Sequence, residues 1–262
     1  MRAPGHAMVP GHALILAAGL GIRLRPLTDR MPKALIDVGG RPMIEYPLRM
    51  LAAAGVETVV VNLHHEGDQI RRALGDGRRY GVRLLYSPED PILDTGGAMV
   101  QARPLLGSGA FLVVNCDALL DVDLAALAAF HRERDALATL VVRSDPEAER
   151  YGPIDLDPAM RIRRFLGKPA GIEPASDRES AEGALERKMF CGVHVISPRI
   201  FDFMPAAGVF SITRDTYAGA HRAGAPLYGF SYEGYWRDLG TQASLDAAHA
   251  DLASGRFFPS YL

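Results

Sequence analysis

A short apolar run near the N-terminus, closed by a glycine-rich turn, limits the possible folds more than any other stretch. Residues 13–18 read Ala-Leu-Ile-Leu-Ala-Ala, and Gly19 and Gly21 follow directly. A run of this length without polar alternation is typical of a strand buried inside a parallel sheet. A glycine turn after such a strand exposes backbone N–H groups and lets a phosphate approach them closely. The chain is therefore expected to place an anion-binding turn at the end of a buried strand.

Strands and helices alternate through the first half of the chain. We expect strands at 57–62, 83–86, 110–115 and 138–143, and helices at 42–54, 66–74, 97–105 and 124–134. This rhythm predicts an α/β protein with a Rossmann-like, doubly wound sheet that carries helices on both faces.

The pattern changes near residue 145, because Pro and Gly become frequent and the apolar segments shorten. Short strands are expected at 151–156, 162–166, 189–196 and 227–232, with a polar loop at 171–186. They predict a mixed sheet with a small additional β-containing part. We expect a loose tail at 1–12 and a single domain at 13–255, divided into halves at 13–145 and 146–255, without an appended hexapeptide β-helix.

Charge and cysteine content narrow the class of partner. The chain has 29 basic and 31 acidic residues, for a formal net charge of −2, which argues against nucleic acid or an anionic membrane as the main partner. Cys116 and Cys191 form no CxxC pattern, so a cytoplasmic location is the simpler expectation. No apolar run is long enough to suggest a membrane span or a secretion signal. The oligomeric state is left open.

Lysine is rare in this chain. Only Lys33, Lys168 and Lys188 occur among the 29 basic residues. Arginine-rich composition can reflect genome bias, but it also suggests that lysine was kept where a compact, mobile ammonium is needed.

The glycine turn does not match the two best-known phosphate-binding motifs. A GxGxxG fingerprint would need glycine where Leu24 stands, which weakens a dehydrogenase interpretation, and no Gly-Lys is followed by Ser or Thr. What remains is a glycine turn with Arg23 and Lys33 nearby, two cations that could neutralise a polyphosphate.

The motifs together resemble those of the sugar-1-phosphate nucleotidylyltransferases. The resemblance begins at Leu16 with LAAGLGIRLRPLTDRMPKAL and continues in the family's order with LDTGGAM, NCD, RYGPI, KP and WRDLGT. It covers about residues 13–251. It implies the nucleotide-diphospho-sugar transferase fold, and a reaction in which an NTP and a sugar 1-phosphate give an NDP-sugar and pyrophosphate.

The resemblance also implies roles for individual residues. The catalytic group comprises Arg23, Lys33, Asp117 and Asp238, and the two carboxylates would bind Mg²⁺, which prefers oxygen ligands. The nucleotide would be bound by Leu16, Ala18, Gly19, Gly21, Arg23, Lys33, Asp94, Thr95, Gly96 and Gly97. The sugar phosphate would be bound by Asn115, Gly152, Lys168 and Gly192.

Two departures from the family pattern lie in the sugar half. Gly167 precedes Lys168-Pro169 where many relatives have Glu, and Phe190-Cys191 precedes Gly192 where relatives often have Asn and a small residue. Among short bacterial relatives, the similarity narrows the reaction to mannose 1-phosphate with GTP or N-acetylmuramate 1-phosphate with UTP, and we favour the first.

Other interpretations remain open. A glycosyltransferase could use Asp121 and Asp123 as a metal-binding DxD, although capping of the helix that follows is the simpler role. A catalytically silent nucleotide-binding subunit is disfavoured because Lys33, Asp117 and Asp238 are all present.

Three further features receive structural interpretations. The pair His64-His65 is expected at an exposed helix start rather than at a metal. Lys188 is expected to be a solvated surface residue, and Trp236 to fix the loop that carries Asp238 by packing.

Overall fold

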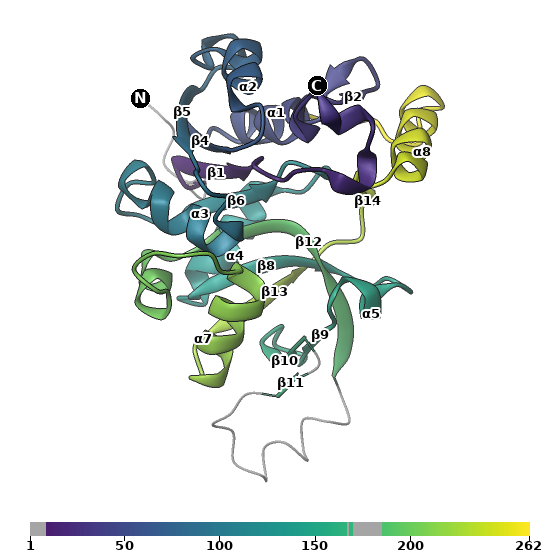
Figure 1. Cartoon of the computed structure of the whole chain (residues 1–262). Coiled ribbons are helices and arrows are strands. Elements are labelled where there is room, and N and C mark those ends of the chain that lie inside the picture. Colours follow the sequence, from purple (N-terminus) through teal and green to yellow (C-terminus); the bar gives the residue numbers. More distant parts are fainter. Residues whose placement is uncertain (1–8, 167, 170–184) are drawn as a thin grey trace, which may run out of the picture.

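The computed structural model describes residues 9–166, 168–169 and 185–262, and within them ten strands form one mixed sheet (Figure 1). Its strands are β1 (His12–Leu16), β4 (Thr58–Leu63), β5 (Arg83–Pro88), β6 (Phe111–Asn115), β8 (Ala138–Arg143), β9 (Ile154–Leu156), β10 (Ile162–Phe165), β11 (Lys168–Pro169), β12 (Glu186–Ile196) and β13 (Leu227–Ser231).

The directions of the strands divide the sheet into two regions. Strands β6, β1, β4 and β5 lie side by side and run parallel. The long strand β12 runs antiparallel to β6 and β8, and its first residues pair with β9, which is followed by the antiparallel strands β10 and β11. The mixed α/β sheet and its added antiparallel strands are therefore confirmed.

Helices cover both faces of the sheet. They are α1 (Glu45–Ala53), α2 (Gly67–Leu74), α3 (Asp94–Ala102), α4 (Leu124–Glu133), α5 (Ala148–Tyr151), α7 (Ala218–Arg222) and α8 (Gln242–Ala253). Successive side chains of β1 point to opposite faces of the sheet and belong to different hydrophobic cores. Ile15 packs in the core with α1, α2 and α4, and Leu14 packs in the core with α3 and α7. This is the doubly wound arrangement expected from the alternation of elements.

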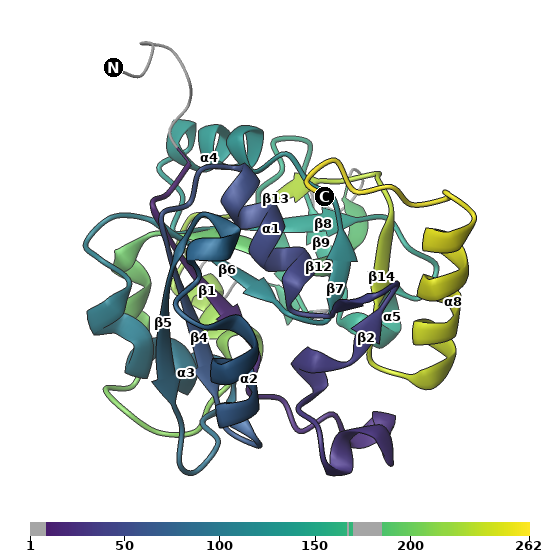
Figure 2. The same ribbon diagram turned by 90° about the horizontal axis from the view of Figure 1, so that it is seen from above.

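Two small sheets lie outside the large one. Strand β7 (Ala118–Leu120) pairs with β14 (Trp236–Asp238), and β2 (Asp37–Val38) pairs with β3 (Arg41–Pro42). A third core, which includes Leu119, Leu239 and Leu245, packs between these strands and α8. Figures 1 and 2 show α8 and β14 side by side on the side of the molecule away from β5.

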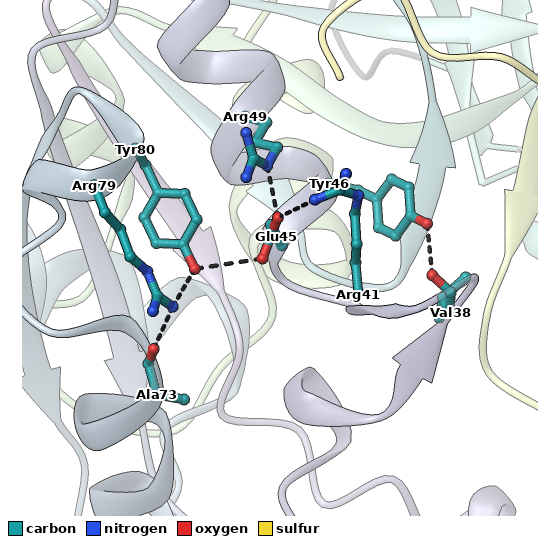
Figure 3. A network of polar contacts seen from close by, with 8 residues as sticks. All are labelled: Val38, Arg41, Glu45, Tyr46, Arg49, Ala73, Arg79 and Tyr80. Atoms are coloured by element: carbon teal, nitrogen blue, oxygen red, sulfur yellow. Dashed lines mark hydrogen bonds and ion pairs between the residues drawn. The ribbon is translucent and has the colours of Figure 1, made fainter.

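A buried carboxylate anchors the start of α1 (Figure 3). Glu45 is 8% exposed and accepts hydrogen bonds from Arg41 at 2.8 Å and Arg49 at 2.6 Å, with the Tyr80 hydroxyl at 3.4 Å. Burial opposes the charge on Glu45, but the hydrogen bonds from the two arginines outweigh it and hold its pKa below the usual range.

The sequence misplaced some boundaries. Helix α3 begins at Asp94, three residues before the predicted start, so the Asp94–Gly97 element forms its first turn rather than a loop. Residues 151–156, predicted as one strand, contain the end of α5 and then β9. The tail at 1–8, Gly167 and most of the predicted loop at 171–186 lie outside the described residues.

Among residues 9–166, 168–169 and 185–262, the structure contains no helix that is both long and apolar enough to cross a membrane.

Candidate active site

The backbone after β1 is held by a buried pair of polar side chains. Asn62 Oδ1 accepts hydrogen bonds from the backbone N–H of Ala17 at 2.6 Å and of Ala18 at 3.3 Å. Asn62 Nδ2 donates to Glu89 Oε1 at 2.7 Å, and Glu89 Oε2 accepts from the backbone N–H of Leu93 at 2.9 Å. This pair therefore connects the turn after β1 to the segment before α3.

Sequence reasoning missed Asn62 and Glu89. Both are almost fully buried, at 4% and 5% exposure. Their positions could have indicated them, because Asn62 ends one predicted parallel strand and Glu89 follows the end of the next. The carboxyl ends of parallel strands form the sheet edge where α/β proteins bind ligands.

Gly21 is required by the shape of the turn. Its φ is +62°, and a Cβ there would lie 2.7 Å from Thr28 Cγ2. The Thr28 hydroxyl donates to the Gly21 carbonyl at 2.9 Å. A side chain at position 21 would therefore be strained and would also displace the following segment, which carries Arg23.

Lys33 and Asp117 form the central ion pair of the site. Lys33 Nζ lies 2.5 Å from Asp117 Oδ2, and the two side chains are 9% and 29% exposed. Burial disfavours the ammonium, but attraction to Asp117 and more weakly to Asp238 outweighs it, so the pKa of Lys33 is raised. Lys33 is therefore a permanent cation at neutral pH.

Asp238 and Arg23 reach the same place from other elements. Asp238 pairs with Ala118 across the β7/β14 sheet, and the Leu239 N–H donates to the Asp117 carbonyl at 2.8 Å. A Cβ on Gly240 would collide with the Arg23 guanidinium and lie 2.5 Å from Asp238 Oδ1. The four predicted catalytic residues therefore converge.

The donor set fits a hard divalent cation. Within the described part of the chain, no three His, Cys, Asp or Glu side chains gather as metal ligands. Mg²⁺ is commonly bound through only one or two carboxylates, with substrate phosphates and waters completing its shell. Asp117 and Asp238, on neighbouring backbone segments, match that requirement. Nearby Cys116 would not act as a thiolate ligand at neutral pH, because burial raises the pKa of its thiol to about 12.

Three neighbouring cavities open at the carboxyl edge of β1 and β6. Cavity A, of about 220 Å³, is lined by Leu16, Ala18, Gly19, Asn62, Glu89, Ile92, Asp94, Thr95, Asn115 and Asp117. Cavity B, of about 480 Å³, is lined by Leu16, Gly19, Leu20, Gly21, Ile22, Arg23, Lys33, Ile92, Cys116, Asp117 and Gly240. Asp117 is shared by the two cavities.

Cavity C continues from cavity A toward β9 and β10. It has a volume of about 530 Å³ and is lined by Asp94, Thr95, Asn115, Arg150, Tyr151, Gly152, Ile154, Phe165, Leu166, Phe190, His194, Ser211, Ile212, Thr213 and Arg214. Asp94, Thr95 and Asn115 are common to cavities A and C.

Two arginines of cavity C were missed as site residues. Arg214 donates to Asp94 Oδ2 at 2.9 Å, and Arg150 pairs with Glu147 at 2.9 Å. Both side chains remain largely exposed. No local pattern predicts that Arg214 returns to Asp94 at the start of α3, because 120 residues separate the two.

Some predicted binding residues do not line these cavities. Gly96 and Gly97 instead allow close packing, since a Cβ on either would overlap Phe210 or the Gly208 carbonyl. Gly192 has φ +88° and packs against the Asn115 side chain. Lys168 lies on β11 with an exposed side chain, paired in the sheet with Phe165 of cavity C.

The DxD residues have structural partners. Asp123 caps α4 by accepting from the N–H groups of Ala125 and Ala126, both at 2.9 Å, as expected. Asp121 does not cap a helix but accepts from Ser260 N at 2.6 Å and Ser260 Oγ at 3.1 Å. The structure therefore gives the DxD-based interpretation no support.

Lys188 was wrongly expected at the surface. It is 3% exposed, its Nζ lies 2.6 Å from Glu186 Oε1, and it donates to Ser231 Oγ at 3.1 Å. The packing interpretation of Trp236 is confirmed, because its ring packs against a hydrophobic core and edge-on against Tyr151 with ring centroids 5.4 Å apart. Its Nε1 also donates to the Cys191 carbonyl at 3.0 Å. His64 and His65 precede α2 and contact the carbonyls of Glu89 and Thr28.

Comparison with known proteins agrees with this architecture. Residues 12–255 match the family described as nucleotidyl transferase. The chain is 37% identical over 241 residues to an N-acetylmuramate alpha-1-phosphate uridylyltransferase of Neisseria meningitidis, covering 91% of this chain and 96% of that protein. It is 32% identical over 246 residues to a mannose-1-phosphate guanylyltransferase of Mycobacterium tuberculosis, covering 93% of this chain and 65% of that protein.

A solved structure of UDP-glucose pyrophosphorylase complexed with UDP-glucose superposes with a TM-score of 0.73 at 18% identity, covering 94% of this chain and 99% of that one. At that identity the likeness concerns the fold alone. The chain spans only 60% of the length of several other curated relatives.

Proposed function

The chain belongs to the nucleotidyl transferase family, and from this membership we propose that it transfers a nucleotidyl group from an NTP to a sugar 1-phosphate, releasing pyrophosphate. The observation that carries the proposal is the convergence of Arg23, Lys33, Asp117 and Asp238 beside three connected cavities. The two free, buried cysteines are consistent with a reducing compartment, and we propose that the reaction occurs in the cytoplasm.

The proposed reaction joins two anions. An oxygen of the sugar phosphate attacks the α-phosphorus of the NTP and forms a new P–O bond. The bond between the α-phosphorus and the oxygen that bridges to the β-phosphorus breaks, and pyrophosphate leaves with that oxygen. The attacking oxygen is already anionic, so no general base is required. The chain must therefore hold the two substrates in line and neutralise their charge.

Each part of the site has a role in this scheme. The turn at Gly19 and Gly21 receives the phosphates of the NTP, and Arg23 and Lys33 stabilise the charge that develops on them. Asp117 and Asp238 would hold Mg²⁺, which supplies further charge neutralisation when bound. Asn115 and Gly152, which line cavity C, are proposed to border the sugar phosphate directly. Gly192 is proposed to act behind Asn115, and Lys168 from β11 beside Phe165 of that cavity.

Cavity A is proposed to receive the nucleobase. Each oxygen of the Glu89 carboxylate accepts one hydrogen bond from the protein and keeps a second lone pair, so it would favour a base whose ring nitrogen carries a hydrogen. Guanine and uracil meet this condition, whereas adenine and cytosine present an acceptor there. Guanine offers two adjacent N–H groups to the carboxylate, and on this basis we favour GTP, with mannose 1-phosphate as the acceptor.

A specific observation supports the second substrate pair. The exposed guanidinium groups of Arg150 and Arg214 at cavity C would suit a sugar that carries a carboxylate. N-acetylmuramate 1-phosphate is such a sugar, and the relative named for it matches this chain over nearly its whole length.

A substrate panel tests both pairs. The purified full chain is incubated with Mg²⁺, each of four NTPs, and either mannose 1-phosphate, glucose 1-phosphate or N-acetylmuramate 1-phosphate, and pyrophosphate release is measured. We expect release with GTP or UTP and at least one acceptor. If no combination releases pyrophosphate, the proposed activity is wrong.

A further inference from the structure

The strand that carries Asp238 is too short to hold its own position. Strand β14 has three residues and pairs only with the three residues of β7 among the described strands. Two-stranded units of this kind are marginally stable when isolated. The placement of Asp238 therefore depends on contacts that β14 makes with other elements.

The two faces of β14 are held differently. Successive side chains of a strand point to opposite faces, so Trp236 and Asp238 share one face and Arg237 occupies the other. Trp236 fixes the first face through its hydrogen bond to the Cys191 carbonyl. Arg237 bonds to Asp251 of α8, the helix beside β14 in Figure 1.

A closed cluster around Asp251 holds the second face. Asp251 is 3% exposed, and its Oδ2 accepts from Arg237 Nη2 at 2.5 Å and from the Tyr235 hydroxyl at 2.8 Å. Arg237 Nε also donates to the Tyr235 oxygen at 2.8 Å, and Arg256 Nη1 donates to Asp251 Oδ1 at 3.0 Å. Both carboxylate oxygens are therefore used by protein partners.

From these contacts we propose that Asp251 is a positioning residue for Asp238. The inference rests on the proposed function, which assigns Asp238 to Mg²⁺. Asp251 fixes the Arg237 side chain, and residues 237 and 238 are adjacent on one short strand, so the clamp limits where the Asp238 carboxylate can lie. Outer partners of metal ligands commonly change metal affinity or activity by about 10–100-fold when they are removed.

The chain contains a matched control for the loss of a buried carboxylate. Glu45 also binds two arginines and lies near a tyrosine hydroxyl, but it belongs to α1 (Figure 3). Asp251→Asn and Glu45→Gln each remove one such charge, so both variants should lower the unfolding temperature. Only Asp251→Asn breaks a contact to β14.

The test measures metal binding directly. Wild type and both variants are titrated with Mn²⁺ in the presence of GTP and, separately, UTP, and free Mn²⁺ is followed by electron paramagnetic resonance. We expect Asp251→Asn to raise the dissociation constant for Mn²⁺ by about tenfold. Glu45→Gln should stay within about twofold of wild type. An unchanged constant in Asp251→Asn, or an equal rise in both variants, would overturn the proposal.

Arg237→Leu breaks the same clamp from the β14 side and replaces Asp251→Asn if that variant does not fold. The wild-type results separate this inference from the proposed function. If wild type neither binds Mn²⁺ with nucleotide nor releases pyrophosphate, the proposed function fails. If wild type does both and the clamp variants bind Mn²⁺ normally, only the role of Asp251 is refuted.

Discussion

Lys33 keeps its charge at a place where burial alone would oppose it. The carboxylate of Asp117 supplies the largest compensating attraction, and the two groups lie 2.5 Å apart. At the scale of single residues, Lys33 is therefore a cation that borders a cavity. It acts through its charge and not as a nucleophile or a proton carrier.

Lys33→Ala should lower kcat by at least about a hundredfold, since a preorganised charge aimed at the transition state is lost. Steady-state pyrophosphate release with the best substrate pair measures this. Lys188→Met is the matched control, because it removes the other buried, ion-paired lysine away from the three cavities. It should lower stability but change kcat by less than about threefold. Comparable losses of kcat in the two variants would contradict the role of Lys33.

Glu89→Gln should weaken selection among nucleobases. The amide presents a donor where the carboxylate offers only acceptors, so adenine and cytosine meet less repulsion. We expect the ratio of kcat/KM for GTP over ATP, or for UTP over CTP, to fall by about tenfold, in line with the ~1–3 kcal/mol cost of a mismatched buried polar group. The kcat/KM values for all four NTPs check this, and unchanged ratios would reject the assignment of cavity A to the base.

At the scale of elements, the start of α3 joins two of the cavities. The N–H of Gly96 donates to the Phe210 carbonyl at 2.8 Å, and the N–H of Ile212 donates to the Thr95 hydroxyl at 2.9 Å. These contacts bring residues 211–214 against the first turn of α3, whose Asp94 and Thr95 line cavity A. Two consecutive glycines are needed because the segment at 208–210 passes directly over them.

Gly97→Ala should destabilise the protein by about 1–3 kcal/mol, because the new Cβ would overlap the Gly208 carbonyl and force the backbone apart. Gly109→Ala is the control, since nothing lies within 4 Å of its Cβ position, and its effect should stay within about 0.5 kcal/mol. Urea unfolding of both variants measures the difference. Equal free energies of unfolding for the two variants would show that the segment at 208–210 moves away from the new methyl group without cost.

At the scale of the whole molecule, one sheet spans both halves of the chain. Strand β12 pairs with β6 on one side and with β8 and β9 on the other, so the predicted nucleotide and sugar halves share a continuous framework. The division into halves at residue 145 stays a prediction. Two neutral histidines are buried near this framework. His131 belongs to α4 and contacts the Thr139 hydroxyl, and His194 lies on β12 beside Tyr217.

Global stability should fall as the pH drops from about 6.5 to about 5. Burial, with repulsion from Arg199, lowers the pKa of His131 to about 4, and burial lowers that of His194 to about 3. In this range the unfolded chain binds protons at these positions and the folded chain does not, so each histidine contributes a slope approaching ~1.4 kcal/mol per pH unit. Above about pH 7.5 both states are neutral, and this contribution to the pH dependence disappears.

Urea unfolding at pH 7.5, 6.5, 5.75 and 5 measures the slope. His194→Phe keeps a planar ring and removes one titrating group, so the stability of this variant should depend less steeply on pH than that of wild type. Identical slopes would mean that His194 takes up its proton equally in the folded and the unfolded chain, so that folding does not lower its pKa.

The sequence alone predicted the α/β class, most of the alternating strands and helices of the first half, and the residues proposed for catalysis. Apolar runs and glycine turns are local signals, so the alternation of strands and helices and the α/β class followed from them. The family motifs named Arg23, Lys33, Asp117 and Asp238 as the proposed catalytic residues, because each motif ties a charged side chain to a turn or strand end at a fixed spacing.

Only the tertiary structure decided which distant residues share a site. The Asn62–Glu89 pair, the return of Arg214 to Asp94 and the Asp251 clamp each join segments whose separation in the chain leaves no periodic or local signal. Burial reversed the interpretation of Lys188 for the same reason, since a lysine is buried or exposed according to the partners that the fold brings to it. Packing and long-range pairing arise only once the chain is folded.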